Sequence, residues 1–391
     1  MASITYKNVL PLNVQDYYTP GSQIDWNVKI GDNARALRNS FKISGQFIPY
    51  KVGLANADNN LDGTLDVRMD ASVGMHAVCS MFITSVNGSQ KEAISYYPRL
   101  IAHRSVAEDS TDAMQANLKY TSEGMSADQK MSAKILLGTT STETIKDLSS
   151  VALRYTPFCI TPKICLNNAV NEAGQNVDLN SSDCAGGINI TLRLGLNNEV
   201  FYGSNATSVK YVLRNVELSW TEIEGEVAVP GGVLLRCTEW IQGNINSGTT
   251  TISHNLANPA SAFSLSFIAN SHNSDPKFNI NALEVLPGVS RLETMIQDRN
   301  LQYKYIQQNQ NEIVWNALNS LDNYDGKSRL NVDDYLHQNM NSYGGILGLN
   351  FGALLPANTR VGLNIVSTVT NVGDYTGPYL FYMYLSTFQK L

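Results

Sequence analysis

The residues best suited to chemistry in this 391-residue chain form a loop that resembles a calcium-binding loop. Within the segment 55–66, oxygen-bearing side chains and one glycine occupy the spacing of early calcium ligands: Asp58, Asn60, Asp62, Gly63 and Asp66. The twelfth position is Met69, where a bidentate Glu is needed, and the flanking residues have strand character. We therefore expect an ordinary Asp-Gly hairpin loop here, with a calcium loop as the alternative.

Histidine and cysteine do not form a metal-binding or catalytic pattern. The five histidines are scattered, at His76, His103, His254, His272 and His337. A two-histidine metal site on a strand or helix needs close spacing, so we interpret them as structural or exposed. The five cysteines, Cys79, Cys159, Cys165, Cys184 and Cys237, are odd in number and lack CxxC spacing. We expect reduced thiols that pack as small hydrophobic residues.

Paired carboxylates raise the question of glycoside hydrolysis. Glu222 with Glu224, and Asp333 with Asp334, could supply an acid and a base or nucleophile. Exposed charges at strand ends explain both pairs more simply. Neither a nucleophile elbow nor a phosphate-binding glycine loop occurs in the sequence. We therefore predict no enzyme activity, no catalytic, cofactor-binding or metal-binding residues, and no cofactor.

Composition favours strands joined by turns. Charged residues make up 16% and hydrophobic residues 43% of the chain, with abundant Gly and Tyr. The net charge is −6 and no run of Lys or Arg occurs, which argues against direct nucleic-acid binding. The first residues have no apolar signal core, and no window approaches 18 apolar residues, so we expect cytoplasmic synthesis and no membrane span.

The clearest strand pattern runs from Gly187 to Trp220. Apolar residues occupy every second position in its first part, at Ile188, Ile190, Leu192, Leu194 and Leu196. In the second part the apolar residues change from odd to even positions. Tyr211 and Leu213 come before the change, and Val216, Leu218 and Trp220 come after it. A bulge near Arg214 and Asn215 would keep one face inward. We predict that the two parts form a long antiparallel hairpin that closes a sheet.

The C-terminal segment repeats this arrangement. From Thr359 to Thr370, apolar residues occupy alternate positions. A glycine-containing turn follows, and the segment from Tyr379 to Phe388 is apolar. This predicts a second closing hairpin. The best boundary between the two units is Glu224 to Gly232, which contains Pro230 and two glycines.

Weaker patterns fill in the two units. In the first we expect strands at 26–30, 41–47, 65–69, 77–86 and 94–102, a helical segment over 107–137, and a bent or edge strand over 151–166. In the second we expect strands at 234–245, 262–269, 278–286, 301–306, 313–318 and 346–351. A short helix beginning at the capping box of Ser290 and Glu293, and another over 332–340, complete the prediction.

Together these patterns predict an all-β fold of two tandem eight-stranded jelly-roll β-sandwiches with short helices in loops. Each unit would carry a helix between its sixth and seventh strands. The predicted organisation is an N-terminal arm over 1–21, a first jelly roll over 22–226 with a helical insertion at about 104–150, and a second jelly roll over 227–391.

This architecture resembles the double jelly-roll major capsid proteins of tailless icosahedral double-stranded DNA viruses, which include membrane-containing phages, virophages, polinton-like viruses and adenovirus. The resemblance covers about residues 22–391 and rests on chain length, the two closing segments and the repeated helix placement. It implies a structural protein of the virion whose trimers have a pseudo-hexameric outline.

The resemblance also implies partners. These are further copies of the chain, penton and minor capsid proteins, and an internal membrane as a further candidate. Assembly would take place in the host cytoplasm or nucleus, and the N-terminal arm would lie beneath the shell on a neighbouring copy or on that membrane. The alternative function is a carbohydrate-binding β-sandwich of the lectin or adhesin type, with Tyr96, Tyr97 and Trp240 as its candidate aromatic residues. A β-sandwich glycoside hydrolase is a third possibility, and it requires facing carboxylates in a cleft.

Overall fold

The computed structural model describes residues 3–51, 67–70, 73–108, 142–144, 152–154, 156–229, 231–284, 289–297, 299–301, 316, 319–320, 346–367 and 378–391. The calcium-like loop, the strand predicted at 313–318 and the helix predicted at 332–340 lie wholly or almost wholly outside these residues. The same holds for the helical segment predicted at 107–137, except for its first two residues.

The first β-sandwich consists of two facing sheets. One has the strand order β1-β13-β4-β9, and the other has the order β2-β12-β5-β6. In the first sheet, the short strand β3 pairs with the last residues of β13, and β11 pairs with β3. The strand bounds are β1 Ile4–Val9, β2 Gln23–Val28, β3 Ala34–Ala36, β4 Lys42–Lys51, β5 Cys79–Val86, β6 Ser89–Ser95, β9 Thr156–Ile160, β11 Leu179–Asn180, β12 Ile188–Leu194 and β13 Val209–Glu224. The strands β7 Thr142–Thr144 and β8 Ala152–Arg154 form a separate pair.

The second β-sandwich has the same plan. Its sheets have the orders β14-β21-β16-β19 and β15-β20-β17-β18, and β10 Ala169–Val170 is added to the β14 edge. The bounds are β14 Leu234–Ile245, β15 Gly248–Asn255, β16 Ala260–Ala269, β17 Val289–Ile296, β18 Arg299–Leu301, β19 Ile346–Leu355, β20 Arg360–Ser367 and β21 Tyr379–Lys390. The helices are α1 Tyr97–Glu108, α4 Asn197–Val200 and α5 Asn270–Ser274, with 3-10 turns at Gly74–Val78, Cys165–Asn167 and Ala206–Ser208.

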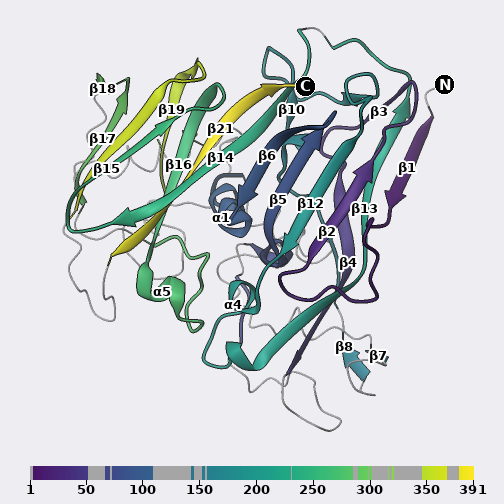
Figure 1. Cartoon of the computed structure of the whole chain (residues 1–391), viewed down its shortest axis with the longest axis horizontal. Helices are drawn as coiled ribbons and strands as arrows, with labels where there is room; N and C mark the ends of the chain where they lie inside the picture. The colour runs from purple at the N-terminus through teal and green to yellow at the C-terminus, as the bar shows by residue number, and fades with distance from the viewer. Residues whose placement is uncertain are drawn as a thin grey trace.

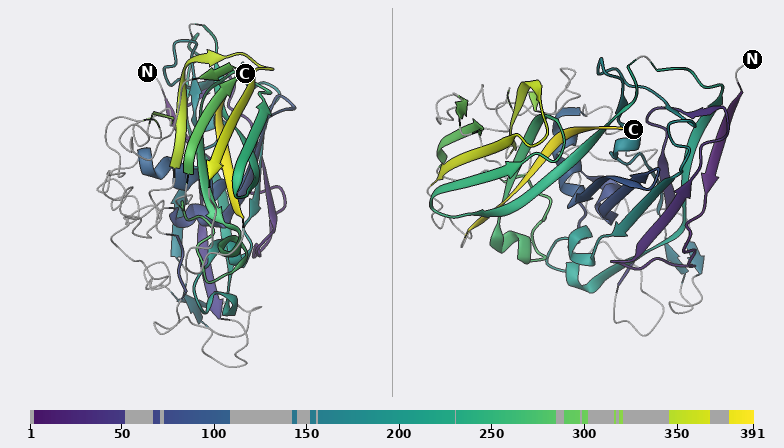
Figure 2. Two further views of the ribbon diagram at one scale, coloured as in Figure 1. Left: turned by 90° about the vertical axis from the view of Figure 1, so that its left-hand side faces the viewer. Right: turned by 45° about the horizontal axis from the view of Figure 1, so that its top comes forward.

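The strand order makes each sandwich a jelly roll. In both units the first strand pairs with the last, and the second strand pairs with the next to last in the opposite sheet. The equivalent positions are held by β1 and β14, β2 and β15, β12 and β20, and β13 and β21. Figure 1 shows the two rolls side by side with α1 between them, and the right-hand view of Figure 2 shows the same arrangement. The predicted all-β double jelly-roll class is therefore confirmed.

Both predicted closing hairpins are wrong. β12 pairs with β2 and β5, whereas β13 pairs with β1, β3 and β4 in the facing sheet. β20 and β21 are likewise in different sheets. The alternation of apolar and polar residues correctly predicted which face of each strand is buried. It contains no information about which strand lies next to it. The connection through α4 crosses from one sheet to the other, where a tight turn would have closed a hairpin.

The predicted bulge in β13 is confirmed. The pairing of β13 with β4 shifts between Arg214 and Glu217, and Asn215 has a backbone φ of 51°. The shift lets Tyr211 and Leu213 before it, and Leu218 and Trp220 after it, all lie buried. In the core behind it, the rings of Phe41 and Trp220 stack with centroids 6.0 Å apart.

Three further sequence predictions are wrong. The strand predicted at 94–102 ends at Ser95, and α1 begins at Tyr97 with Pro98 in its first turn, a position that proline favours. The segment predicted to begin a helix at Ser290 and Glu293 is instead strand β17. It pairs with β20, and this pairing overrides the local capping pattern. Residues 278–284 form turns, with a single bridge from Glu284 to Phe267, rather than a strand.

The segment 1–21, predicted to be a separate arm, contains strand β1. Its six residues pair in full with β13, so this part of the segment belongs to the first sandwich. The strand expected within 151–166 is β9, which lies at the edge of its sheet with Pro157 inside it, as predicted.

Candidate functional site: the junction between the two rolls

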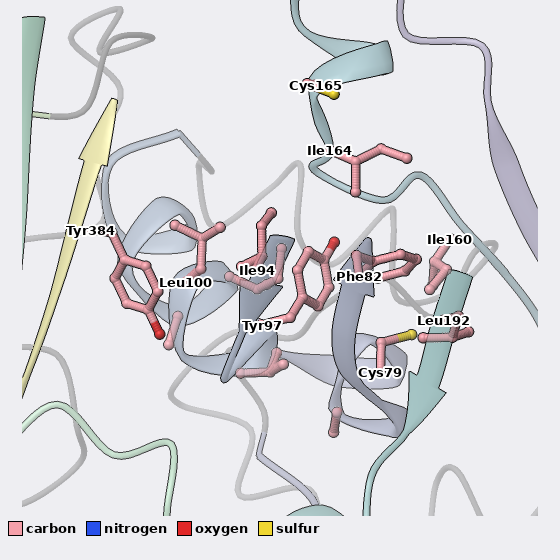
Figure 3. Packing of buried hydrophobic residues seen from close by; sticks show 14 of the residues in the cluster. Cys79, Phe82, Ile94, Tyr97, Leu100, Ile160, Ile164, Cys165, Leu192 and Tyr384 are labelled. Carbon is pink, nitrogen blue, oxygen red and sulfur yellow. The ribbon is translucent and has the colours of Figure 1, made fainter. Parts of the chain in front are cut away.

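Helix α1 is the central element of the contact between the two jelly rolls. It follows β6 of the first roll and lies next to β21 of the second (Figure 1). Figure 3 shows Tyr97 of this helix pointing toward Phe82 of the first roll, while Tyr384 of β21 lies at the other end of the cluster near Leu100. The helix therefore belongs to the cores of both rolls.

On the first-roll side, Tyr97 anchors the helix. Its ring meets Phe82 edge to face, with centroids 4.7 Å apart. Its hydroxyl accepts a hydrogen bond from the Lys163 amide at 2.8 Å and lies 3.2 Å from Nδ1 of His76. Burial, with a smaller contribution from the charge of Lys163, lowers the pKa of His76 to about 3. The imidazole is therefore neutral and can accept a hydrogen bond from the Tyr97 hydroxyl.

On the second-roll side, the helix buries the cation of Arg99, which is 2% exposed. Its guanidinium donates to the Ser266 hydroxyl and the Ala282 carbonyl, each at 3.2 Å, and to the Ile280 carbonyl. The guanidinium carbon lies 4.3 Å from the ring centre of Tyr382. Burial lowers the pKa of Arg99, and nearby phenol and carboxyl groups oppose that shift. A buried cation needs such partners, so these contacts connect the rolls specifically.

His103 makes a second contact one helical turn further on. The side chain is fully buried, with Nδ1 2.9 Å from the Ser264 hydroxyl and its ring edge-on to Tyr384 at 5.1 Å. Burial, together with the charge of Arg99, keeps the pKa of His103 well below its ordinary value. Both contacts reach across the junction, because Ser264 lies in β16 and Tyr384 in β21.

Three aromatic rings pack at the residue that precedes α1. Tyr96 meets Trp240 and Tyr382 edge to face, with centroids 5.3 Å and 4.9 Å apart. Its carbonyl accepts a hydrogen bond from the Tyr384 hydroxyl at 2.9 Å. Tyr96 has a φ of 54°, a left-handed conformation that is uncommon for a bulky residue and that these contacts must compensate.

A buried carboxyl group joins backbone segments on the two sides of the junction. Glu92 of β6 is 3% exposed and accepts hydrogen bonds from the Cys165 amide at 2.8 Å and the Thr238 amide at 2.6 Å. Burial raises the pKa of Glu92 to about 7, against the lowering effect of these two amides and of Arg104. Thr238 lies in β14 of the second roll, so one side chain of the first roll fixes the position of a strand in the second.

Strand pairing and hydrogen bonds to main-chain carbonyls continue along the same edge. Ala169 and Val170 of β10 pair with β14, so a segment from the first half of the chain extends a sheet of the second roll. The Lys91 ammonium donates to the Lys390 carbonyl at 3.0 Å, and the side-chain amide of Gln389 donates to the Lys91 carbonyl at 2.6 Å. These contacts, with those of α1, hold the two rolls in one fixed orientation.

The four histidines within the described residues do not come together, and His337 lies outside those residues. His76 and His103 are buried separately at the junction. His254 lies 3.2 Å from a Glu239 oxygen, and His272 lies 2.5 Å from a Glu284 oxygen. These carboxylates are 15 and 12 residues distant in sequence, which hid them from a search for short motifs. Among the described residues, no His, Cys, Asp and Glu side chains gather into a group that could hold a metal ion.

The predicted packing of the cysteines as small buried residues is confirmed for four of the five. All five are free, and Cys79, Cys165, Cys184 and Cys237 are buried while Cys159 is half-buried. The carboxylate pair was predicted as exposed, and this is wrong for one member. Glu222 is 3% exposed and accepts hydrogen bonds from the Trp220 indole at 2.7 Å and the Gly31 amide at 3.2 Å, whereas Glu224 is exposed. The pair Asp333 and Asp334 lies outside the described residues.

The aromatic candidates for sugar binding are all engaged in packing. Tyr97 is fully buried, and Tyr96 and Trp240 meet edge to face at the junction. Sequence reasoning missed Arg99, Glu92 and His103 as functional residues, because their importance depends on the second roll. The single available signal was the presence of ionisable side chains, Arg99, His103 and Arg104, on a segment with the apolar residues of a core.

Comparison with solved structures shows what the chain is similar to. It matches the Faustovirus major capsid protein with a TM-score of 0.57 at 9% identity, over 100% of this chain and 90% of that one. It matches the Sputnik virophage structure with a TM-score of 0.63 at 11% identity, over 99% and 85%. The mavirus major capsid protein matches with a TM-score of 0.53 at 11% identity, over 99% and 87%.

Neither a protein-family model nor a curated protein matches the sequence. With identities near 10%, the structural matches establish the fold: the chain has the double jelly-roll fold of these capsid proteins over its whole length. In the described part of the chain, no helix has the length and apolar character needed to cross a bilayer.

Proposed function

We propose that the chain is a major capsid protein that builds the icosahedral shell of a double-stranded DNA virus as pseudo-hexameric trimers. The observation that carries this proposal is the pair of jelly rolls with identical strand order, locked side by side by α1, in a chain that matches capsid proteins from end to end. Three copies of two equivalent rolls give six similar units around a three-fold axis.

The junction supports this role physically. A trimer approximates a hexagon only if the two rolls of each copy keep a fixed angle and spacing. The buried Arg99, His103 and Glu92 contacts provide that rigidity, because misplacing either roll would leave buried polar groups without partners. A pair of rolls joined only by a flexible linker would not define such an outline.

Strand β1 supplies a surface for contact with neighbouring copies. It lies at a sheet edge, and five apolar side chains of the strand and of the residues after it are exposed, with the polar Asn8 among them: Ile4 63%, Tyr6 83%, Leu10 60%, Leu12 68% and Val14 65%. Edge strands with apolar outward faces tend to associate, so in a shell-forming protein we assign this face to another copy.

The remaining partners follow from the same proposal. They are penton and minor capsid proteins, with an internal membrane as a further candidate, in a virion assembled in the host cytoplasm or nucleus. The net charge of −6 favours packaging of the genome without direct nucleic-acid contact by this chain. The protein acts structurally rather than as an enzyme. The sugar-binding alternative is disfavoured, because Tyr97 is buried and the ring of Tyr96, although 37% exposed, is held edge to face against Trp240 and Tyr382.

Negative-stain electron microscopy of the purified protein tests the proposal. Capsomers should appear as particles of hexagonal outline, and concentrated samples should form sheets or shells with the same repeat. Single elongated particles of one copy at every concentration would overturn it.

A further inference from the structure

In the second roll, the outer side of the first strand, β14, is closed by residues of the first roll. The backbone amide of Arg236 donates to the Asn168 carbonyl at 3.2 Å, and the backbone amide of Thr238 donates to the Glu92 carboxyl group at 2.6 Å. The short strand β10 pairs with β14 beside these two bonds. The outward amides of β14 therefore obtain their partners from the first roll.

Strand β1 holds the equivalent position in the first roll, and its outer edge is open. In the antiparallel ladder with β13, the Glu224 amide donates to the Ser3 carbonyl at 3.1 Å, so every second residue of β1 from there on bonds to β13. The backbone amides that point away from β13 are those of Ile4, Tyr6 and Asn8. Within the part of the chain that the structure describes, these three amides have no hydrogen-bond partner.

The second roll of the same copy is too far away to close this edge. Figure 1 shows β1 at one end of the molecule and β15, β17 and β18 at the other, with the rest of the first roll between them, and the right-hand view of Figure 2 agrees. A protein segment that closes the edge therefore has to come from another copy. The exposed apolar side chains of Ile4 and Tyr6 on this strand are typical of a contact surface.

We propose that the outer edge of β1 binds the second roll of a neighbouring copy, at its edge strand β18, in a contact equivalent to that between β6 and β14 within one copy. This inference rests on the proposed capsid function and names the two surfaces that meet in the trimer. The choice of β18 follows from the strand order. β6 is the last strand in β2-β12-β5-β6, and β18 is the last strand in β15-β20-β17-β18.

The junction within one copy is the template for this contact. β6 lies against β14 and supplies Glu92 to it, so the equivalent of β6, which is β18, lies against the equivalent of β14, which is β1 of the next copy. The contact joins unlike surfaces, and head-to-tail contacts of this kind close into a ring when the rotation between copies allows it. Three copies then place a similar junction at every boundary between rolls, alternately within a copy and between copies.

Cysteine cross-linking of the assembled protein tests this contact. In the double variant Tyr6→Cys with Asn300→Cys, which places thiols on β1 and β18, a short bismaleimide should join chains into covalent dimers and trimers on a denaturing gel. The matched control is Tyr6→Cys with Thr249→Cys, on β15 at the opposite edge of the same sheet. It should give no more cross-linked product than Tyr6→Cys alone, which also measures any reaction of the half-buried Cys159.

Hydrogen exchange of the wild-type protein gives a second readout that needs no substitution. In the oligomer, the amides of Ile4, Tyr6 and Asn8 should exchange at least about tenfold more slowly than in an unstructured peptide of the same sequence. A trimer in which these amides exchange at the unstructured rate, or in which the β1–β18 variant cross-links no better than its control, would overturn the inference and leave the proposed function standing. A monomer at every concentration would overturn both.

Discussion

The guanidinium of Arg99 in the first roll lies 4.3 Å from the ring centre of Tyr382 in the second. The same group donates three hydrogen bonds to the second roll while remaining 2% exposed. One side chain thus makes several of the polar contacts between the rolls. Substituting it tests directly whether these contacts hold the junction together.

Arg99→Met should weaken the junction. The substitution keeps an apolar stem of similar length but leaves the Ser266 hydroxyl and the Ala282 and Ile280 carbonyls without their donor. We expect the free energy of unfolding to fall by about 3 kcal/mol, measured by urea denaturation. Arg193→Met, at an exposed position on β12, is the control and should change it by less than about 0.5 kcal/mol. Equal effects of the two substitutions would show that Arg99 does not hold the rolls together.

Glu92 should make stability depend on pH. Its pKa in the folded protein is raised to about 7 from an ordinary value of 4.5, so folding favours the protonated form. The contribution is fully present below pH 4.5 and is lost as the pH rises to about 7, for a total of about 3 kcal/mol.

Glu92→Gln removes this titration. We expect the difference in unfolding free energy between wild type and variant to change across pH 4.5–7 and to be constant above and below. Glu224→Gln, at an exposed position, should track the wild type throughout. A difference that stays constant over the whole range would mean that Glu92 does not titrate as proposed.

His76 should have the opposite dependence. Its pKa in the folded protein is lowered to about 3 from 6.5, so folding favours the neutral form. The contribution of His76 to the free energy of unfolding is fully present above pH 6.5 and is lost as the pH falls toward 3. The loss should approach roughly 4 kcal/mol. In His76→Gln, which keeps an acceptor for the Tyr97 hydroxyl, thermal unfolding between pH 6.5 and 4 should show a smaller acid dependence than the wild type. An unchanged acid dependence would rule out this role for His76.

The exposed face of β1 should matter for association and not for folding. The double substitution Ile4→Ser with Tyr6→Ser removes two outward apolar side chains, which are 63% and 83% exposed. We expect an unchanged melting temperature but a higher concentration requirement for assembly, measured by sedimentation velocity. Lys7→Ser on the same strand is the matched control. If assembly of the double variant equals that of the control, the contact between copies lies elsewhere.

The sequence was informative where a residue's environment depends on its own strand. Alternating apolar residues from Ile188 to Leu194 correctly predicted β12, and the change of phase around Arg214 and Asn215 correctly located the bulge in β13. Two repeated units with a boundary near Pro230 pointed to the tandem jelly rolls. The predicted domain bounds of 22–226 and 227–391 remain a prediction.

Features that depend on partners distant in sequence could not be predicted. Alternation cannot tell a hairpin from two strands in facing sheets, which is why β12 and β13 were wrongly paired. The capping pattern of Ser290 and Glu293 is local, whereas β17 forms because β20 pairs with it. The junction residues depend on such distant partners too. Nothing near Arg99 in sequence predicts that Tyr382 will lie over its guanidinium.

The central claim is that the chain forms trimeric capsomers, and its most direct test is the mass of the purified protein at micromolar concentration. Light scattering coupled to size-exclusion chromatography gives that mass independently of shape. We predict a stable particle of about three times 42.9 kDa, with larger shells on concentration. A monomer whose mass or elution shifts only when glycans or calcium are added would contradict the claim and favour a binding module.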